Sequence, residues 1–282
     1  MHAAEPDAAL VARLRSAGCV FAEAEAALLE SAFDGLPAAA AAAELERLVA
    51  RRVAGDPLEQ LLGWAEFGGA RILLEPGVFV PRRRTELLAE TAAAAALGIG
   101  ASGRVPVVVD LCCGAGAIGA LIADVAAPVD LVAADLDPAA VLAARRNLEP
   151  RGGRVFEGDL FDALPVELRG QVDVLAVNAP YVPTDEIAMM PPEARDHEAR
   201  MALDGGDDGL DVHRRVAASA RAWLAPGGCL VIETSRRQSS TTLALVEAGG
   251  LAGRIEADLE RGGTIVIGLR AGSPAPAHPS SA

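Results

Sequence analysis

The sequence of 282 residues has no lysine, only four cysteines and few aromatic residues, which make up 3% of the chain. Acidic residues outnumber basic ones, 39 to 25, so the formal net charge is −14. A field of this sign repels a polyanion, and we therefore expect no direct nucleic-acid binding. The cysteines show neither metal-ligand nor disulfide-framework spacing, which favours reduced thiols in a cytoplasmic protein without a metal site. They are Cys19, Cys112, Cys113 and Cys229.

Long apolar runs are also missing, since none approaches the ~20 residues that span a bilayer. The first ten residues lack the basic and apolar regions of a signal peptide, so we expect no membrane association. A hydrophobic content of 51% indicates a globular chain with a substantial core. The tail from Ala271, rich in proline and serine, is expected to be disordered.

The first 54 residues carry helical periodicity, with apolar residues at three- and four-residue intervals. Breaks at Gly18 and at residues 34–37 predict three helices. Three short amphipathic helices bury little by themselves, so they are expected to form a small cap on a larger neighbour.

A β-rich stretch follows the cap. Residues 71–74 and 78–80 flank the turn signal Glu75-Pro76-Gly77 and predict a hairpin that links the cap to the main domain. Three arginines, residues 82–84, then open a helix with Thr85 and Glu86. The cluster fits a solvated face, and it also fits contact with an anionic or carboxylate-bearing ligand.

From residue 105 onward, strand and helix patterns alternate, which predicts a doubly wound, mostly parallel sheet. Strands are expected at 107–111, 129–134, 154–156, 172–177, 228–233, 254–259 and 264–269, and helices at about 117–125, 138–148, 209–224 and 241–248. The last two strands are joined by only Arg261-Gly262-Gly263. A connection this short predicts an antiparallel hairpin.

A glycine-rich turn follows the first strand of this sheet. Gly114, Gly116 and Gly119 have the spacing of a nucleoside-cofactor turn, and Asp135 ends the next strand, where an acid binds a ribose diol. The spacing alone leaves NAD and S-adenosylmethionine open. Asp110, directly before the turn, would repel a pyrophosphate and attract the ammonium of a methionine moiety.

The stretch VDVLAVNAPYVP, residues 172–183, predicts a buried strand that ends at a rigid turn. An amide nitrogen attacks a sulfonium methyl only if acceptors hold its N–H groups and orient its lone pair. The Asn178 side chain and the Ala179 carbonyl are suited to accept these N–H groups, Pro180 stiffens the turn, and Tyr181 offers a flat face for stacking. A strand-terminating turn with a buried tyrosine is the alternative interpretation.

With these motifs in order, the chain resembles the HemK/PrmC-like class I methyltransferases that modify glutamine in peptide chain release factors. The resemblance extends over the cap and over GVFVPRRRTE, DLCCGAGAIG, AADLDPAAVLAARRN, GDLF, VNAPYVP, EARDHEARMALDGGDDGLDVHRR and LAPGGCLVIE. It implies a seven-stranded Rossmann-like α/β fold with an antiparallel last strand, S-adenosylmethionine as donor, and a release factor or a related protein as partner.

The resemblance also assigns the site and the domains. It implies donor contacts from residues 112–116, Asp135, Asp159, Leu160 and Asn178, with Phe79 at the edge of the cleft, and a substrate amide on residues 178–181. Third-strand Asp159 would hydrogen-bond an adenine amino group, or simply cap the next turn. The expected domains are an N-terminal helical substrate-recognition domain (1–63), a β-hairpin linker (64–84), the methyltransferase domain (85–270) and the tail (271–282).

Three departures from the family pattern stand out. Ala179 replaces a proline of the usual tetrad, which removes one φ restraint but keeps the carbonyl. Cys112 replaces a glycine, so a positive φ there would store strain of order 1 kcal/mol. PRRRTE replaces a linker with a second proline and an acid after the first arginine. These differences suggest a paralogue with a different acceptor.

Other functions share parts of this pattern. An adenine or cytosine amino-methyltransferase uses the same tetrad, an NAD-dependent oxidoreductase the same glycine spacing, and a non-catalytic cofactor-binding protein would tolerate the altered tetrad. In the charged segment 193–211 a substrate-side loop, capped by Asp208 at the next helix, is favoured over a metal site. His213 is expected to be a packed or solvated histidine.

Overall fold

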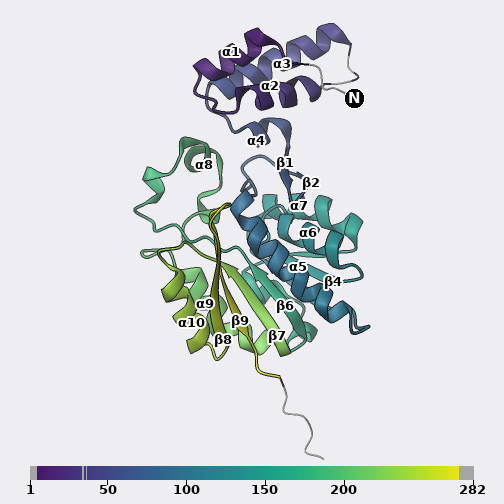
Figure 1. Ribbon diagram of the computed structural model, residues 1–282, viewed down its shortest axis with the longest axis vertical. Coiled ribbons are helices and arrows are strands. Elements are labelled where there is room, and N and C mark those ends of the chain that lie inside the picture. The colour runs from purple at the N-terminus through teal and green to yellow at the C-terminus, as the bar shows by residue number, and fades with distance from the viewer. Residues whose placement is uncertain (1–4, 34, 36, 273–282) are drawn as a thin grey trace, which may run out of the picture.

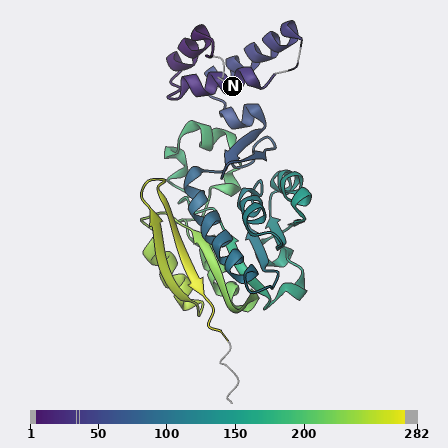
Figure 2. The same cartoon turned by 45° about the vertical axis from the view of Figure 1, so that its right-hand side comes forward.

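The computed structural model describes residues 5–33, 35 and 37–272 (Figure 1). The expected disordered tail therefore lies, from residue 273 on, outside the described residues. The three predicted N-terminal helices are confirmed as α1 (Ala8–Ser16), α2 (Ala22–Ser31) and α3 (Ala38–Val53). They share a small core of their own, which includes Leu14, Leu29 and Val49, and they stand at one end of the molecule in both views (Figures 1 and 2).

The linker contains a short helix, α4 (Leu58–Leu62), and a hairpin of β1 (Trp64–Phe67) and β2 (Ala70–Leu73). A hairpin was expected, but its predicted pairing of residues 71–74 with 78–80 is wrong. Gly68 and Gly69 both adopt positive φ, +57° and +78°, which suits a two-residue hairpin turn. Residues 78–80 belong to no strand, and the Val80 N–H donates instead to Glu198 Oε1 at 3.1 Å.

The main domain is built on the predicted seven-stranded sheet, with strand order β5-β4-β3-β6-β7-β9-β8. Its strands are β3 (Val107–Leu111), β4 (Asp130–Asp135), β5 (Arg154–Glu157), β6 (Val172–Val177), β7 (Leu224–Glu233), β8 (Ala252–Asp258) and β9 (Gly263–Leu269). The first five run parallel, and β9 pairs antiparallel with both β7 and β8. The predicted antiparallel final hairpin is thus confirmed.

Helices cover both faces of this sheet. α5 (Glu86–Gly100), α6 (Ala117–Ala126) and α7 (Pro138–Leu148) pack on one face, and α9 (Asp211–Trp223) and α10 (Ser239–Ala248) on the other (Figures 1 and 2). Val108 and Val109 are both fully buried, one in each layer. Burial on both faces explains why the central strands are continuous apolar runs rather than alternating ones.

A long loop between β6 and α9 carries α8 (Pro192–His197) and 3-10 turns at Ile187–Met189 and Arg200–Ala202. It contacts the cap and the linker: Arg52 of α3 pairs with Glu193 at 2.6 Å, and the Ala199 N–H donates to the Gly77 carbonyl at 3.0 Å. Asp208 accepts from the Leu210 N–H at 3.1 Å, just before α9. Across the described residues, no cluster of histidine, cysteine or carboxylate side chains could hold a metal ion.

No helix within residues 5–272, as far as they are described, combines the length and the apolar composition needed to cross a bilayer.

Candidate active site

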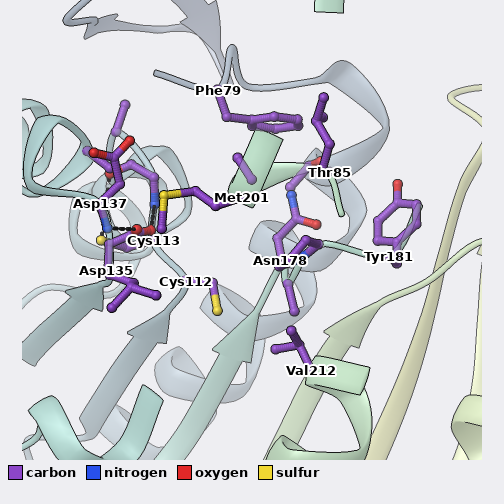
Figure 3. A pocket seen from close by; sticks show the side chains of 18 of the residues that line it. Phe79, Thr85, Cys112, Cys113, Asp135, Asp137, Asn178, Tyr181, Met201 and Val212 are labelled. Atoms are coloured by element: carbon purple, nitrogen blue, oxygen red, sulfur yellow. Dashed lines mark hydrogen bonds between the residues drawn. The ribbon is translucent and has the colours of Figure 1, made fainter. Parts of the chain in front are cut away.

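A cavity of about 470 Å³ opens at the carboxyl ends of β3, β4 and β6 (Figure 3). This is the sheet edge at which α/β proteins bind ligands, and the volume is within the usual range of ligand pockets. Most residues expected at the site line it: Phe79, Cys112, Gly114, Asp135, Asp159, Leu160, Asn178, Ala179, Pro180 and Tyr181. Asp110 and Gly116 are not among the lining residues.

The glycine turn after β3 has left-handed backbone at Cys112, Gly114 and Gly116, with φ of +57°, +54° and +80°. Cys112 thus meets the condition under which strain was expected, and a non-glycine residue at this positive φ carries strain of order 1 kcal/mol. A side chain at Gly116 would come within 2.9 Å of Leu148 on α7. Gly116 thus allows close packing of the turn against α7.

Asp110 lies beneath the turn and does not line the cavity. It is fully buried, and its Oδ2 accepts from the Gly119 N–H of α6 at 2.8 Å, while its Oδ1 has no partner among the described residues. Burial raises the pKa of Asp110 to about 8. The sequence placed this acid beside an ammonium group, but its anchoring to α6 instead makes it a support of the turn.

Acids at the ends of β4 and β5 reach the cavity. Asp135 accepts from the N–H groups of Gly114 at 2.8 Å and Asp137 at 2.9 Å, so it holds the turn while lining the cavity. Burial raises its pKa, which a ligand hydroxyl donating to the carboxylate would counteract. Asp159 pairs with Arg215 of α9 at 2.7 Å, and both line the cavity.

The residues after β6 present free acceptors to the cavity. Within the described chain, neither the side-chain amide of Asn178 nor the carbonyl of Ala179 has a hydrogen-bond partner, although the Ala179 residue is only 2% exposed. Asn178 lies between Asp135 on one side and Tyr181 on the other (Figure 3). The arrangement leaves two oxygens available for a bound N–H group.

Tyr181 is fixed by several groups. Its hydroxyl donates to Glu233 Oε1 at 3.0 Å, its carbonyl accepts from Gln238 Nε2 at 3.0 Å, and its ring meets His213 edge-on at 6.4 Å. Arg84 lies over the same ring at 6.0 Å. Burial raises the pKa of Tyr181, so its phenol stays protonated and acts as a wall, not a base.

The packed position expected for His213 is confirmed, because the side chain is 1% exposed and its Nε2 lies 3.0 Å from the Glu233 carbonyl. Burial lowers its pKa to about 4, compared with about 6.5 in an unfolded chain. At a pH between these two pKa values, the His213 side chain is protonated in the unfolded state and neutral in the folded state. We therefore expect the free energy of unfolding to fall as the pH drops from about 6.5 toward 4, by up to roughly 3 kcal/mol.

Urea unfolding at several pH values measures this dependence in wild type and in His213→Gln. The variant should lose the part of the acid slope that the wild type shows in this window. Equal slopes in the two proteins would contradict a neutral, buried His213.

Asn147 of α7 connects the linker to the glycine turn. Its Oδ1 accepts from the Leu73 N–H at 2.9 Å, and its Nδ2 donates to the carbonyls of Leu73 at 2.9 Å and Ala115 at 2.8 Å. We expect Asn147→Ala to lower the free energy of unfolding by about 2 kcal/mol, because these buried groups would lose their partner. Urea unfolding measures this loss, and a free energy of unfolding in Asn147→Ala equal to that of wild type would contradict the connection.

Sequence reasoning missed Asn147, Glu233 and Gln238. Glu233 is the last residue of the apolar strand β7, which pairs with β6. A carboxylate at the end of a buried strand beside β6 was a usable signal that this residue belongs to the site. Asn147 and Gln238 sit in helical patterns or at a helix start without any local feature that sets them apart. The backbone groups that Asn147 binds lie 74 and 32 positions away, and the carbonyls that Gln238 binds lie 57 and 30 positions away.

The cavity fits a nucleoside-type methyl donor. The left-handed turn brings backbone close to the cavity, Asp135 supplies acceptors for a ribose diol, and Phe79 and Leu160 supply apolar walls. Asn178, next to this turn, marks the place where the acceptor would meet the donor.

Comparison with known proteins places these features in a family. Residues 70–204 match the family model of the methyltransferase small domain. The release factor glutamine methyltransferase of Geobacter sulfurreducens is 36% identical over 227 residues, or 80% of this chain and 77% of the relative. The 4-amino-L-phenylalanine/4-methylamino-L-phenylalanine methyltransferase of Streptomyces pristinaespiralis is 38% identical over 203 residues, or 72% and 69%.

A methyltransferase from Pyrococcus furiosus has a similar structure, with a TM-score of 0.51 at 17% identity over 73% of this chain and 91% of the other. At this identity the likeness confirms the predicted fold alone. The sequence identity carries the assignment, because it extends over 77% of the Geobacter protein. The chain belongs to the release factor glutamine methyltransferase family.

Proposed function

We propose that this protein transfers a methyl group from S-adenosylmethionine to the side-chain amide nitrogen of a protein glutamine, with a peptide chain release factor as the acceptor. The observation that carries the proposal is the pair of unpartnered oxygens on Asn178 and Ala179 beside the glycine turn. The activity in the name of the Geobacter relative supports the same acceptor class.

The chemistry needs orientation more than proton transfer. When bound, S-adenosylmethionine supplies an electrophilic sulfonium methyl. The amide nitrogen of glutamine is a poor nucleophile because its lone pair is delocalised. Asn178 Oδ1 accepts one N–H and the Ala179 carbonyl accepts the other, which turns the lone pair toward the donor side of the cavity.

Tyr181 forms the wall against which the planar amide lies. Glu233, Gln238 and His213 hold that wall, so the ring keeps its position when the acceptor enters. No general base is needed before the attack, because the proton can leave the nitrogen after the methyl has been transferred. Asp135 and residues 112–114 hold the donor at the opposite side.

Intact-mass analysis tests the proposal. Purified release factors are incubated with the enzyme and S-adenosylmethionine, and fragmentation then assigns the modified residue. The expected result is one added methyl group on a glutamine. Unmodified release factors, under conditions in which the donor binds, would remove them as the acceptor.

A second acceptor class is favoured by the Streptomyces relative, whose named substrate is an arylamine on a free amino acid. An arylamine is also a planar nitrogen with a delocalised lone pair, so the same two oxygens would serve it. The replacement of the usual tetrad proline by Ala179 is compatible with a changed acceptor. Incubation with 4-amino-L-phenylalanine distinguishes this class, because methylation of that amine without methylation of release factors would replace the glutamine assignment.

A further inference from the structure

Arg84 lies near Tyr181 on the lining of the cavity, and both terminal nitrogens of its guanidinium are available to bind a ligand. It lines the cavity, its side chain is 45% exposed, and its guanidinium lies 6.0 Å from the centre of the Tyr181 ring. Its neighbour Arg83 is exposed but does not line the cavity. The three consecutive arginines therefore have different surroundings.

One hydrogen bond, to Glu233, orients the guanidinium over the Tyr181 ring. Arg84 Nε lies 3.3 Å from Oε1 of Glu233, which is 2% exposed and also accepts from the Tyr181 hydroxyl. Both terminal nitrogens of Arg84 lack a hydrogen-bond partner among the described residues. These two nitrogens form the edge of a guanidinium that binds a carboxylate or phosphate through two parallel hydrogen bonds.

The other arginines of the cavity differ in this respect. Arg82 donates a terminal nitrogen to Glu198 at 2.5 Å, and Arg215 donates one to Asp159 at 2.7 Å. Acidic side chains also line the cavity on the donor side, including Asp135 and Asp137. An anion that enters would thus be repelled there and attracted at Arg84.

A second polar group without a partner lines the same cavity. Thr85 lines the cavity and is 3% exposed, and its hydroxyl has no partner among the described residues. Figure 3 shows Thr85 on the side of Asn178 and Tyr181, away from Asp135. An unpaired buried hydroxyl on the lining of a cavity indicates that a polar group of a ligand binds there.

We propose that Arg84, together with its sequence neighbour Thr85, binds a carboxylate of the acceptor, so that the accepted molecule carries an acid in addition to its planar nitrogen. This inference rests on the proposed nitrogen methylation. Two sources supply that chemistry: an acidic residue adjacent to the target glutamine, or the α-carboxylate of a free amino acid that bears an arylamine. A phosphodiester is disfavoured by the net charge of −14.

The test compares matched pairs of probes on the full-length protein saturated with S-adenosylhomocysteine. One pair is a blocked peptide with glutamine next to glutamate and the same peptide with that glutamate as its methyl ester. The other pair is 4-amino-L-phenylalanine and its methyl ester. Binding to wild type and to each variant is measured by calorimetric titration, the Arg84 side-chain N–H signal is followed by NMR in wild type, and KM values are measured with S-adenosylmethionine.

For at least one pair, the acid is expected to bind wild type about tenfold more tightly than the ester. The difference should fall below about twofold in Arg84→Gln and persist in Arg83→Gln, the matched control. Affinity for S-adenosylhomocysteine should stay unchanged in both variants. The pair that shows the preference identifies the source of the carboxylate.

Equal or absent binding of acid and ester to wild type would overturn the inference. A preference for the acid that survives in Arg84→Gln would also overturn it, as would an Arg84→Gln variant that binds S-adenosylhomocysteine more weakly but the acid as tightly as wild type does. A response of the Arg84 signal to dimethyl phosphate and to neither acid would also overturn it. Binding of an acid without methylation would support the carboxylate subsite and contradict the proposed function. Methylation with equal KM for acid and ester would support the proposed function and contradict the subsite.

Discussion

Asn178→Ala is expected to lower kcat by about 10²–10³-fold while the affinity for S-adenosylhomocysteine stays within about tenfold. The reason is that Asn178 Oδ1, unpartnered at the cavity, would orient the acceptor nitrogen in the transition state. Removing it should affect the attack more than the binding of the donor, which Asp135 and the glycine turn would hold. Single-turnover kinetics and calorimetric titration measure the two effects separately.

Asn178→Asp is the matched control, because it keeps an oxygen acceptor at the same position. We expect its turnover to exceed that of Asn178→Ala. An unchanged rate in Asn178→Ala would remove this residue from the mechanism. A large loss of donor affinity without loss of kcat would assign Asn178 to the donor alone.

Gly209→Ala should lower kcat/KM by about 10²-fold, because it would displace the turn that carries Tyr181. Gly209 has φ of +76°, and a side chain there would overlap the Tyr181 carbonyl oxygen and approach Gln238 Nε2. Gln238 holds both the Tyr181 carbonyl, at 3.0 Å, and the Asp208 carbonyl, at 2.9 Å. An added methyl group at Gly209 would separate these contacts.

Gly227→Ala separates this clash from backbone strain. Gly227 has a similar φ, +83°, but a side chain there meets no atom within 4 Å. The control should lose about 1 kcal/mol of stability from the left-handed backbone and keep its activity. Comparable kcat/KM values in Gly209→Ala and Gly227→Ala, measured at a temperature where both are folded, would show that the Tyr181 turn does not depend on Gly209.

Secondary structure was predictable where burial and local chemistry agree. The strand at 172–177 and the helix at 138–148 were placed with the bounds that the structure has. Both are uninterrupted patterns bounded by strong signals: Asn178-Ala179-Pro180 after the strand, and Asp137, whose side chain accepts from the Ala139 N–H, before the helix. Local interactions were sufficient in these segments.

The linker shows where local reasoning failed. Glu75-Pro76-Gly77 is a true turn signal, but the chain after it does not pair with β2. Val78 and Val80 are buried against the main domain, and Val80 binds Glu198, a residue 118 positions away. A distant carboxylate supplies the acceptor that the predicted hairpin partner would have supplied.

By itself the sequence determined the sheet, its final antiparallel hairpin and the two turns at the centre of the cavity, after β3 and after β6, because strand ends, glycine turns and the apolar runs before them are local patterns. Only the tertiary structure decided that Asp110 supports the turn from beneath, that Glu233 holds Tyr181 and Arg84 together, and that Arg84 differs from Arg83. Hydrogen bonding and burial at these positions depend on residues far apart in the chain, so no local pattern encodes them.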